Sequence, residues 1–142
     1  MNTFKILSSD QKLKIEVRKI MLNQQEIELI EYMDYQVLNN GMDGWLGNRA
    51  YEKVFEFIEI LKKRNSELDQ QVASIFTKVT VSGLGYYQHK DSIFIPEIKE
   101  ICDKYEKEIE ECSKQYQQIA KDFMNSYGLE DCLTKFTKNI SS

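Results

Sequence analysis

Apolar side chains recur every three or four residues along most of this chain, which is the spacing of one face of an α-helix. A short stripe runs over residues 10–21. A longer one begins after Asn23, and its inward positions are Ile27, Ile30, Met33 and Val37. Asn23 followed by Glu26 is typical of a helix start, and Asn39-Asn40-Gly41 is typical of a helix end. We therefore expect a short first helix and a longer second one.

Two further stripes predict a helical hairpin. The first runs over residues 48–63, with Asn48 as its cap, and its inward positions are Tyr51, Val54, Ile58 and Leu61. The second begins at Ser66, where Asp69 completes a capping-box pattern, and its inward positions are Leu68, Val72, Ile75, Phe76 and Val79. Because only Arg64-Asn65 separates the two stripes, we expect them to be antiparallel neighbours.

The helical period is lost between Thr80 and Ile95. Thr80-Val81 and residues 92–95 have strand-like composition around two glycines, which favours a short β-hairpin or an ordered loop. The segment Ser82-Gly83-Leu84-Gly85 contains Gly-x-Gly, but it lacks the lysine and hydroxyl of a phosphate-binding loop. We interpret it as a turn.

The longest predicted helix begins at Pro96, which suits a first helical turn, and continues to Tyr127 before Gly128. Its apolar positions alternate in steps of four and three: Ile98, Cys102, Tyr105, Ile109, Cys112, Tyr116, Ile119 and Phe123. This heptad seam either faces the protein's own bundle or pairs two copies into a homodimer. A short helix over residues 129–136 completes the chain.

These elements predict an all-α fold, a bundle of five to six helices with one long C-terminal helix and a short β-hairpin around 80–95. The chain has 142 residues, of which 42% are hydrophobic, so we expect residues 1–142 to form a single domain. No run approaches the roughly 18 apolar residues of a membrane span, and the N-terminus lacks a secretory signal. We therefore expect a soluble, cytoplasmic protein that does not contact membranes.

Cysteine usage agrees with a reducing compartment. The chain has three cysteines, and Cys102 and Cys112 lie ten residues apart on one predicted helix, about 15 Å along its axis. That separation is too long for a disulfide, so we expect reduced, packed thiols.

Charge is unevenly distributed. Residues 1–22 have a net charge of +3, residues 23–111 hold 18 acids and 10 cations for a net charge of −8, and residues 112–142 have +1. A surface that binds nucleic acid needs Lys and Arg to replace the counterions of phosphates. The acidic middle of the chain therefore argues against direct binding of nucleic acid.

The residues that most catalytic and metal sites require are scarce. His89 is the only histidine, and no cysteine lies near it in the sequence, so a zinc site or a nucleophile-histidine pair is not expected. A diiron bundle needs two Glu-x-x-His pairs and is excluded. We expect no catalytic residue, no metal and no cofactor, which favours a non-enzymatic binding protein.

Five residues are candidates for binding a partner. Glu52, Glu56 and Glu59 form an acidic row on one predicted helix, which is either a solvated face or a charge array for a basic groove. Trp45 and Asp43 belong to a glycine-rich segment over 41–48, where the indole either anchors a loop or forms a binding hot spot.

The segment Tyr35-Gln36-Val37-Leu38-Asn39-Asn40-Gly41-Met42-Asp43-Gly44-Trp45-Leu46-Gly47-Asn48 resembles part of a bacterial family named for a DNA-mimic protein. In that family a helix ends in an Asn-Gly-Gly-Phe-like turn, followed by aromatics, an asparagine and another helix. The likeness covers residues 27–76, with Met42 at the position of the family's second glycine. It implies an all-α fold, dimerisation and an acidic surface that binds a DNA-binding protein in place of the phosphates of DNA.

Three non-enzymatic hypotheses follow, beside a fourth in which carboxylates act as catalysts without histidine. The leading one is an acidic protein that inhibits a nucleic-acid-binding protein by occupying its basic site. The first alternative is a toxin-immunity protein or a phage inhibitor of host defence, comparable to anti-CRISPR proteins, that recognises its target through Trp45. The second alternative is a structural homodimer held together by the long helix.

Overall fold

The computed structural model describes residues 22–47 and 51–141. Over these residues the chain forms five α-helices and one short 3-10 helix, without a β-strand. The elements are α2 (Gln24–Gly47), α3 (Tyr51–Arg64), α4 (Glu67–His89), η1 (Lys90–Ser92), α5 (Pro96–Ser126) and α6 (Cys132–Ser141). The expected all-α bundle with one long helix is confirmed, while the expected first helix over 10–21 lies outside the described residues.

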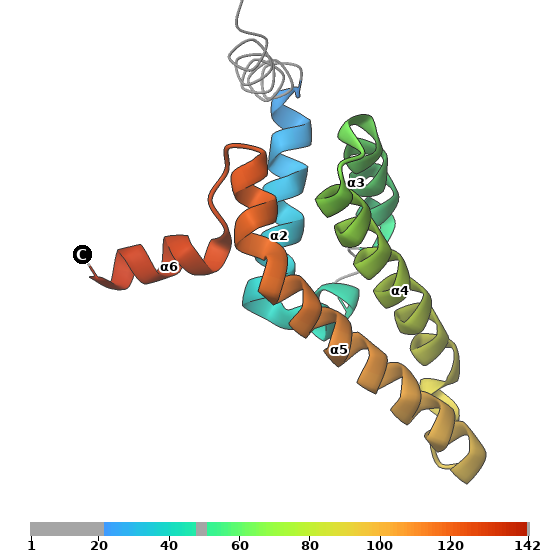
Figure 1. Cartoon of the computed structure of the whole chain (residues 1–142). Coiled ribbons are helices and arrows are strands. Elements are labelled where there is room, and N and C mark those ends of the chain that lie inside the picture. Colours follow the sequence, from blue (N-terminus) through green and yellow to red (C-terminus); the bar gives the residue numbers. More distant parts are fainter. Residues whose placement is uncertain (1–21, 48–50, 142) are drawn as a thin grey trace, which may run out of the picture.

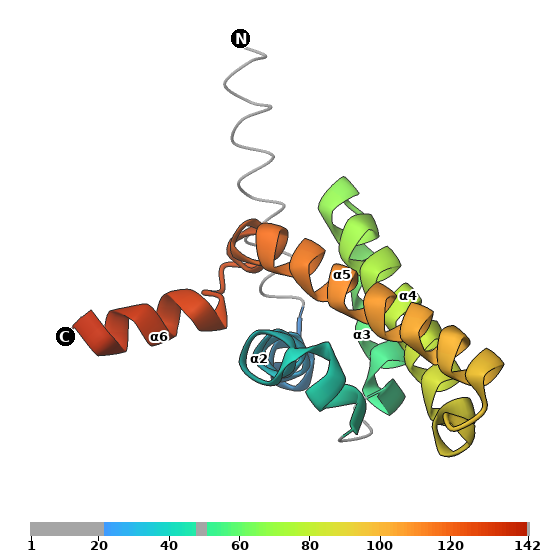
Figure 2. The same cartoon turned by 90° about the horizontal axis from the view of Figure 1, so that it is seen from below.

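The helices form a bundle with extensions on two sides. α3, α4 and α5 follow one another as antiparallel neighbours, and α2 packs against the C-terminal part of α5 (Figure 1). The end of α4, η1 and the start of α5 extend beyond the other helices as a two-helix arm, residues 81–105 (Figure 1). α6 projects sideways from the opposite side of the bundle, as Figure 2 also shows.

Aromatic rings hold α3, α4 and α5 together. Phe76 of α4 packs edge-on against Phe57 of α3, with 4.9 Å between ring centroids, and against Tyr116 of α5, with 5.4 Å. Phe123 of α5 lies 6.2 Å from the ring of Phe57. All four side chains are fully buried. Edge-to-face contacts of this kind add stability beyond the removal of apolar area from water.

The heptad seam of α5 is buried inside the chain. Its buried positions are Cys102, Ile109, Cys112, Tyr116 and Phe123, and the other three are partly buried. The buried stripe of α4 follows the same alternation of four and three, through Val72, Phe76, Val79 and Gly83. The predicted seam is therefore confirmed, and it serves the protein's own bundle.

Local sequence signals fix several helix ends. Ser66 Oγ accepts a hydrogen bond from the backbone N–H of Asp69 at 3.1 Å, and the Asp69 carboxylate accepts one from the backbone N–H of Ser66 at 3.0 Å, which confirms the predicted capping box. The chain leaves α5 through Gly128, whose φ of 73° belongs to the left-handed region. Its N–H donates to the Asn125 carbonyl at 2.9 Å and that of Leu129 to the Met124 carbonyl at 2.9 Å, the pair of bonds of a Schellman motif.

The expected end of the second helix at Asn39-Asn40-Gly41 is wrong. α2 continues through these residues to Gly47, so the backbone of Asp43 and Trp45 is helical instead of forming a loop. Each glycine in a helix costs only about 1 kcal/mol relative to alanine. Apolar residues continue at helical spacing through Leu38, Met42 and Trp45, and that continuity accounts for the longer helix.

The expected β-hairpin around 80–95 is also wrong, as is the turn at Ser82–Gly85, and the expected loop is confined to residues 93–95. α4 passes through this segment to His89, and η1 follows directly. Ser82 and Gly83 are buried, and a Cβ atom on Gly85 would lie 2.5 Å from Cζ of Tyr105 in α5. The small residues therefore let α5 approach α4 closely, and this packing outweighs the strand-like composition.

Smaller differences concern α3 and α6. Val54 and Leu61 are buried as predicted and Ile58 is partly buried, but Phe57 and Ile60 are buried as well, so α3 has a wider apolar face. α6 begins at Cys132 instead of residue 129. The carboxylate of Asp131 accepts a hydrogen bond from the backbone N–H of Thr134 at 3.2 Å and so caps the start of this helix.

Candidate functional site

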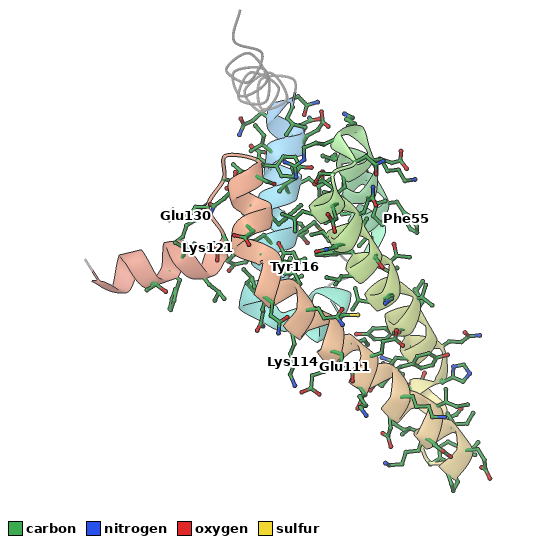
Figure 3. The ribbon with its side chains drawn as sticks, in the orientation of Figure 1. Phe55, Glu111, Lys114, Tyr116, Lys121 and Glu130 are labelled. Atoms are coloured by element: carbon green, nitrogen blue, oxygen red, sulfur yellow. The ribbon has the colours of Figure 1, made fainter. Side chains whose placement is uncertain are left out.

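The acidic row predicted from the sequence lies on α3. Glu56 and Glu59 are exposed, and Glu59 forms an ion pair with Lys62 at 3.2 Å. Glu52 belongs to the first turn of the same helix, and its side chain is outside the described ones. Phe55, which the charge pattern did not single out, is 66% exposed and projects from the outer side of α3 (Figure 3). It is next to Glu56 in the sequence and four residues before Glu59.

Asp43 and Trp45 belong to a different element, the last two turns of α2. The structure describes the backbone of these residues but not their side chains. α2 and α3 are neighbours in the bundle, so the five predicted site residues come from two adjacent helices. The role of these five residues in binding a partner stays a prediction.

Two buried carboxylates stand out in the polar structure of the core. Asp69 accepts hydrogen bonds from Nε and Nη2 of Arg64, both at 2.6 Å, and from the hydroxyl of Tyr127 at 2.9 Å. The Arg64 guanidinium also lies 4.0 Å from the centroid of the Tyr127 ring. Burial would raise the pKa of Asp69, but the hydrogen bonds from Arg64 and Ser66 outweigh it and hold the pKa below its ordinary value.

Asp34 is the second buried carboxylate and has a different set of partners. It accepts a hydrogen bond from the hydroxyl of Tyr116 at 2.6 Å and one from the backbone N–H of Cys132 at 2.8 Å. Burial raises the pKa of Asp34 to about 6, and the neighbouring carboxylate of Asp131 acts in the same direction. Both hydrogen bonds act in the opposite direction and lower the pKa. This residue joins α2 to α5 and to the first turn of α6.

The buried carboxylates are used for cohesion between helices. Every buried polar side-chain atom among the described residues has a hydrogen-bond partner. An acid or base that acts on a substrate needs a face open to that substrate. Asp69 is enclosed, whereas Asp34 lies at the wall of a pocket between α2 and α6. The two oxygens of Asp34 accept hydrogen bonds from Tyr116 and from the backbone N–H of Cys132, so both carboxylates also hold helices together.

A pocket of about 260 Å³ opens between α2 and α6. Tyr32 and Tyr35 of α2, Met124 of α5 and Cys132 of α6 form part of its wall. The carboxylates of Glu31 and Glu130 border it, the latter on the connection between α5 and α6 (Figure 3). Asp34 and Lys135 also line it, and the accessible surface of the wall is mainly apolar.

The reactive residue types lie in positions typical of structural side chains. Cys102 and Cys112 are buried, Cys132 is partly buried, and burial raises the pKa of the Cys112 and Cys132 thiols. A raised pKa disfavours the nucleophilic thiolate. His89 Nδ1 lies 2.9 Å from the carbonyl oxygen of Gly85 in its own helix. Within residues 22–47 and 51–141, no three His, Cys, Asp or Glu side chains gather as metal ligands would.

The end of the arm exposes consecutive apolar side chains. Phe94 is 80% exposed, and Ile93 and Ile95 on either side of it are more than one-third exposed. Leu84 and Tyr87 of α4 and Ile101 of α5 add exposed apolar area along the arm. We call Ile93, Phe94 and Ile95 the arm tip.

None of the described helices combines the length and apolar character needed to cross a membrane. Comparison with models of known protein families, with curated proteins and with solved structures found no match to this chain.

Proposed function

We propose that this protein acts without catalysis, by binding another protein through the arm tip. The observation that carries the proposal is the 80% exposure of Phe94 between two exposed isoleucines. Large apolar side chains that are adjacent in space and exposed mark interaction surfaces, and aromatic residues are enriched among those that dominate binding energy. The partner is a protein with an apolar pocket that receives the Phe94 ring.

The arm holds this tip in a fixed conformation. The backbone N–H of Ile95 donates to the carbonyl of Ser92 at 3.0 Å, and Pro96 opens α5 directly afterwards. Below the tip, Gly85 allows the ring of Tyr105 to pack against α4. A surface ordered before binding loses less conformational entropy in the complex.

Charges beside the tip favour a protein over a lipid surface. Lys90 and Asp91 lie in η1, and Glu97 and Lys99 lie in the first turn of α5, so cations and acids are balanced. Segments that bind anionic membranes concentrate Lys and Arg next to their apolar residues. A balanced rim around an apolar centre is the usual composition of a protein interface.

Site-specific photocrosslinking tests this proposal. A benzophenone amino acid at position 94 should capture a defined protein in cells of the native host, and the same group at Lys78, an exposed position on α4 away from the tip, should not. The captured protein, once purified, should bind the unmodified chain and lose affinity for Phe94→Ser. Crosslinks to lipid, or equal capture from both positions, would refute the proposal.

The exposed face of α3 supports a second candidate, in which the protein occupies the basic site of a nucleic-acid-binding protein. Its specific observation is the exposed ring of Phe55 beside the exposed carboxylates of Glu56 and Glu59. An aromatic side chain among carboxylates suits an interface in which charge steers the partner and the ring anchors it. The resemblance to the DNA-mimic family agrees with this candidate.

Charge reversal separates the two candidates. Converting Glu52, Glu56 and Glu59 to lysine should abolish binding if the α3 face is the interface, and binding should then weaken steeply as salt rises. If the arm tip is the interface, this variant should bind like the unmodified chain and show little dependence on salt. Trp45→Ala tests in the same assay whether α2 contributes, as the immunity-protein alternative requires.

A further inference from the structure

α6 exposes apolar side chains on a helix that projects from the bundle (Figures 1 and 2). Leu133 is 45% exposed and Phe136, three residues later on the same side of the helix, is 62% exposed. Tyr35 of α2, which borders the pocket between α2 and α6, is 48% exposed. An amphipathic helix whose apolar side chains remain in water is the expected state of a helix separated from its partner.

The neighbouring pocket suits one apolar side chain. Its volume of about 260 Å³ is below the roughly 300–1,000 Å³ of small-molecule sites. Tyr32, Tyr35 and Met124 offer two aromatic rings and a thioether, which pack favourably against another ring. Phe136 and this pocket are thus complementary features of the same chain.

Charge points to a second copy as the occupant. α2 contains five acids and neither Lys nor Arg, while α6 contains two lysines and no acid. Asp34 is buried and Glu26 pairs with Lys63, so among the described side chains Glu28 and Glu31 are the acids that α2 offers to a partner. Within the chain Lys135 already contacts Glu31 at 3.2 Å. In a two-fold dimer each copy supplies one basic α6 and one acidic α2. The contact between α6 of one copy and α2 of the other therefore forms twice.

We propose that two copies of this chain associate about a two-fold axis, with Phe136 of each copy in the Tyr32–Tyr35–Met124 pocket of the other. Leu133 covers the contact between the two α6 helices, and Lys135 faces the acidic α2 of the other copy. The inference goes beyond the proposed function, because it uses the end of the molecule opposite the arm tip.

Sedimentation velocity over a concentration series of about 1 μM to 1 mM tests the dimer. The unmodified chain should shift from monomer to dimer within this range. Phe136→Ser removes the inserted ring and Tyr35→Ser removes one wall of the pocket, so each should weaken association at least about tenfold. Both residues are partly or largely exposed, and the urea midpoint of each monomer reports that it folds.

Two further samples sharpen the test. Phe94→Ser alters an equally apolar but distant surface and should dimerise like the unmodified chain. An equimolar mixture of Phe136→Ser and Tyr35→Ser retains one of the two contacts, and should therefore associate more strongly than either variant alone. The proposal would be overturned if the unmodified chain stayed monomeric throughout the concentration series. It would also be overturned if association survived either Phe136→Ser or Tyr35→Ser, or if it were lost only in Phe94→Ser.

Discussion

Asp69 and Asp34 are both buried carboxylates that join helices, but they differ in what neutralises them. Asp69 faces the guanidinium of Arg64, and its charged form is favoured. Asp34 receives only the hydroxyl of Tyr116 and one backbone N–H as direct hydrogen-bond donors, and its pKa rises to about 6. A buried carboxylate beside a cation thus stays charged, whereas one held by neutral donors gains a proton more readily.

The largest effect is expected from removing the cation beside Asp69. Arg64→Met leaves that carboxylate buried without a counter-charge, and it also removes the hydrogen bond from Nη1 to the Ser126 carbonyl at 2.8 Å. The free energy of unfolding should fall by about 3–5 kcal/mol, as for other broken buried ion pairs. Urea denaturation at pH 7 measures this. A loss below about 1 kcal/mol would show that Asp69 does not depend on Arg64.

Asp34 should give stability a pH dependence of the opposite sign to that of Asp69. Its pKa is about 6 in the folded protein and 3.8 in an unperturbed aspartate, so between these values the folded state holds more protons than the unfolded chain. The free energy of unfolding therefore falls as pH rises through this window, by about 3 kcal/mol. Asp69, with a lowered pKa, contributes stability that is lost as pH falls.

Asp34→Asn isolates this contribution. The free energy of unfolding of the unmodified chain, relative to that of the variant, should fall as the pH rises from about 4 to 7. Urea denaturation at several pH values measures the difference. If it stays constant across that range, Asp34 has an ordinary pKa and the contrast with Asp69 fails.

Two matched tyrosine substitutions compare the carboxylates directly. Tyr116→Phe leaves Asp34 with a single donor, whereas Tyr127→Phe leaves Asp69 with Arg64 and Ser66. We expect Tyr116→Phe to cost about 1–3 kcal/mol and Tyr127→Phe about 1 kcal/mol or less. Tyr116→Phe should also raise the pKa of Asp34, observable by carbon NMR of the carboxyl group. Equal costs would mean that the number of remaining donors does not decide stability here.

The smallest effect is expected at the periphery of the Asp69 network. Ser126 Oγ accepts a hydrogen bond from Nη2 of Arg64 at 2.7 Å and is partly exposed. Ser126→Ala should cost about 0.5–1.5 kcal/mol, because water can replace the lost acceptor. Thermal denaturation measures it. A cost as large as that of Arg64→Met would place the main support of Arg64 at Ser126 instead of Asp69.

Much of the fold followed from local signals. The capping box at Ser66, the helix stop at Gly128 and the seam of α5 depend on residues a few positions apart, and the structure confirms all three. The continuation of α4 through residues 80–89 was missed because glycine carries no apolar side chain. Gly83 and Gly85 therefore interrupted a stripe that the packing of Tyr105 completes.

The contacts between helices and the exposed candidate interfaces were less predictable, because no local sequence pattern marks either of them. Asp34 and Tyr116 are 82 positions apart, and no local pattern pairs them. Phe55 was overlooked between glutamates that suggested a charged surface. The composition of the segment 92–95 indicates a strand of a hairpin or an ordered loop, and neither reading predicts that its apolar side chains are exposed. Exposure, which only the fold reveals, turns those residues into a candidate interface.

The most direct test of the proposed division between a folding core and a binding arm uses the protein captured by crosslinking at position 94. Its affinity should fall at least about tenfold for Phe94→Ser, whose free energy of unfolding should stay within about 0.5 kcal/mol of the unmodified chain. Unchanged affinity for a folded Phe94→Ser variant would contradict the assignment of the arm tip as the binding surface.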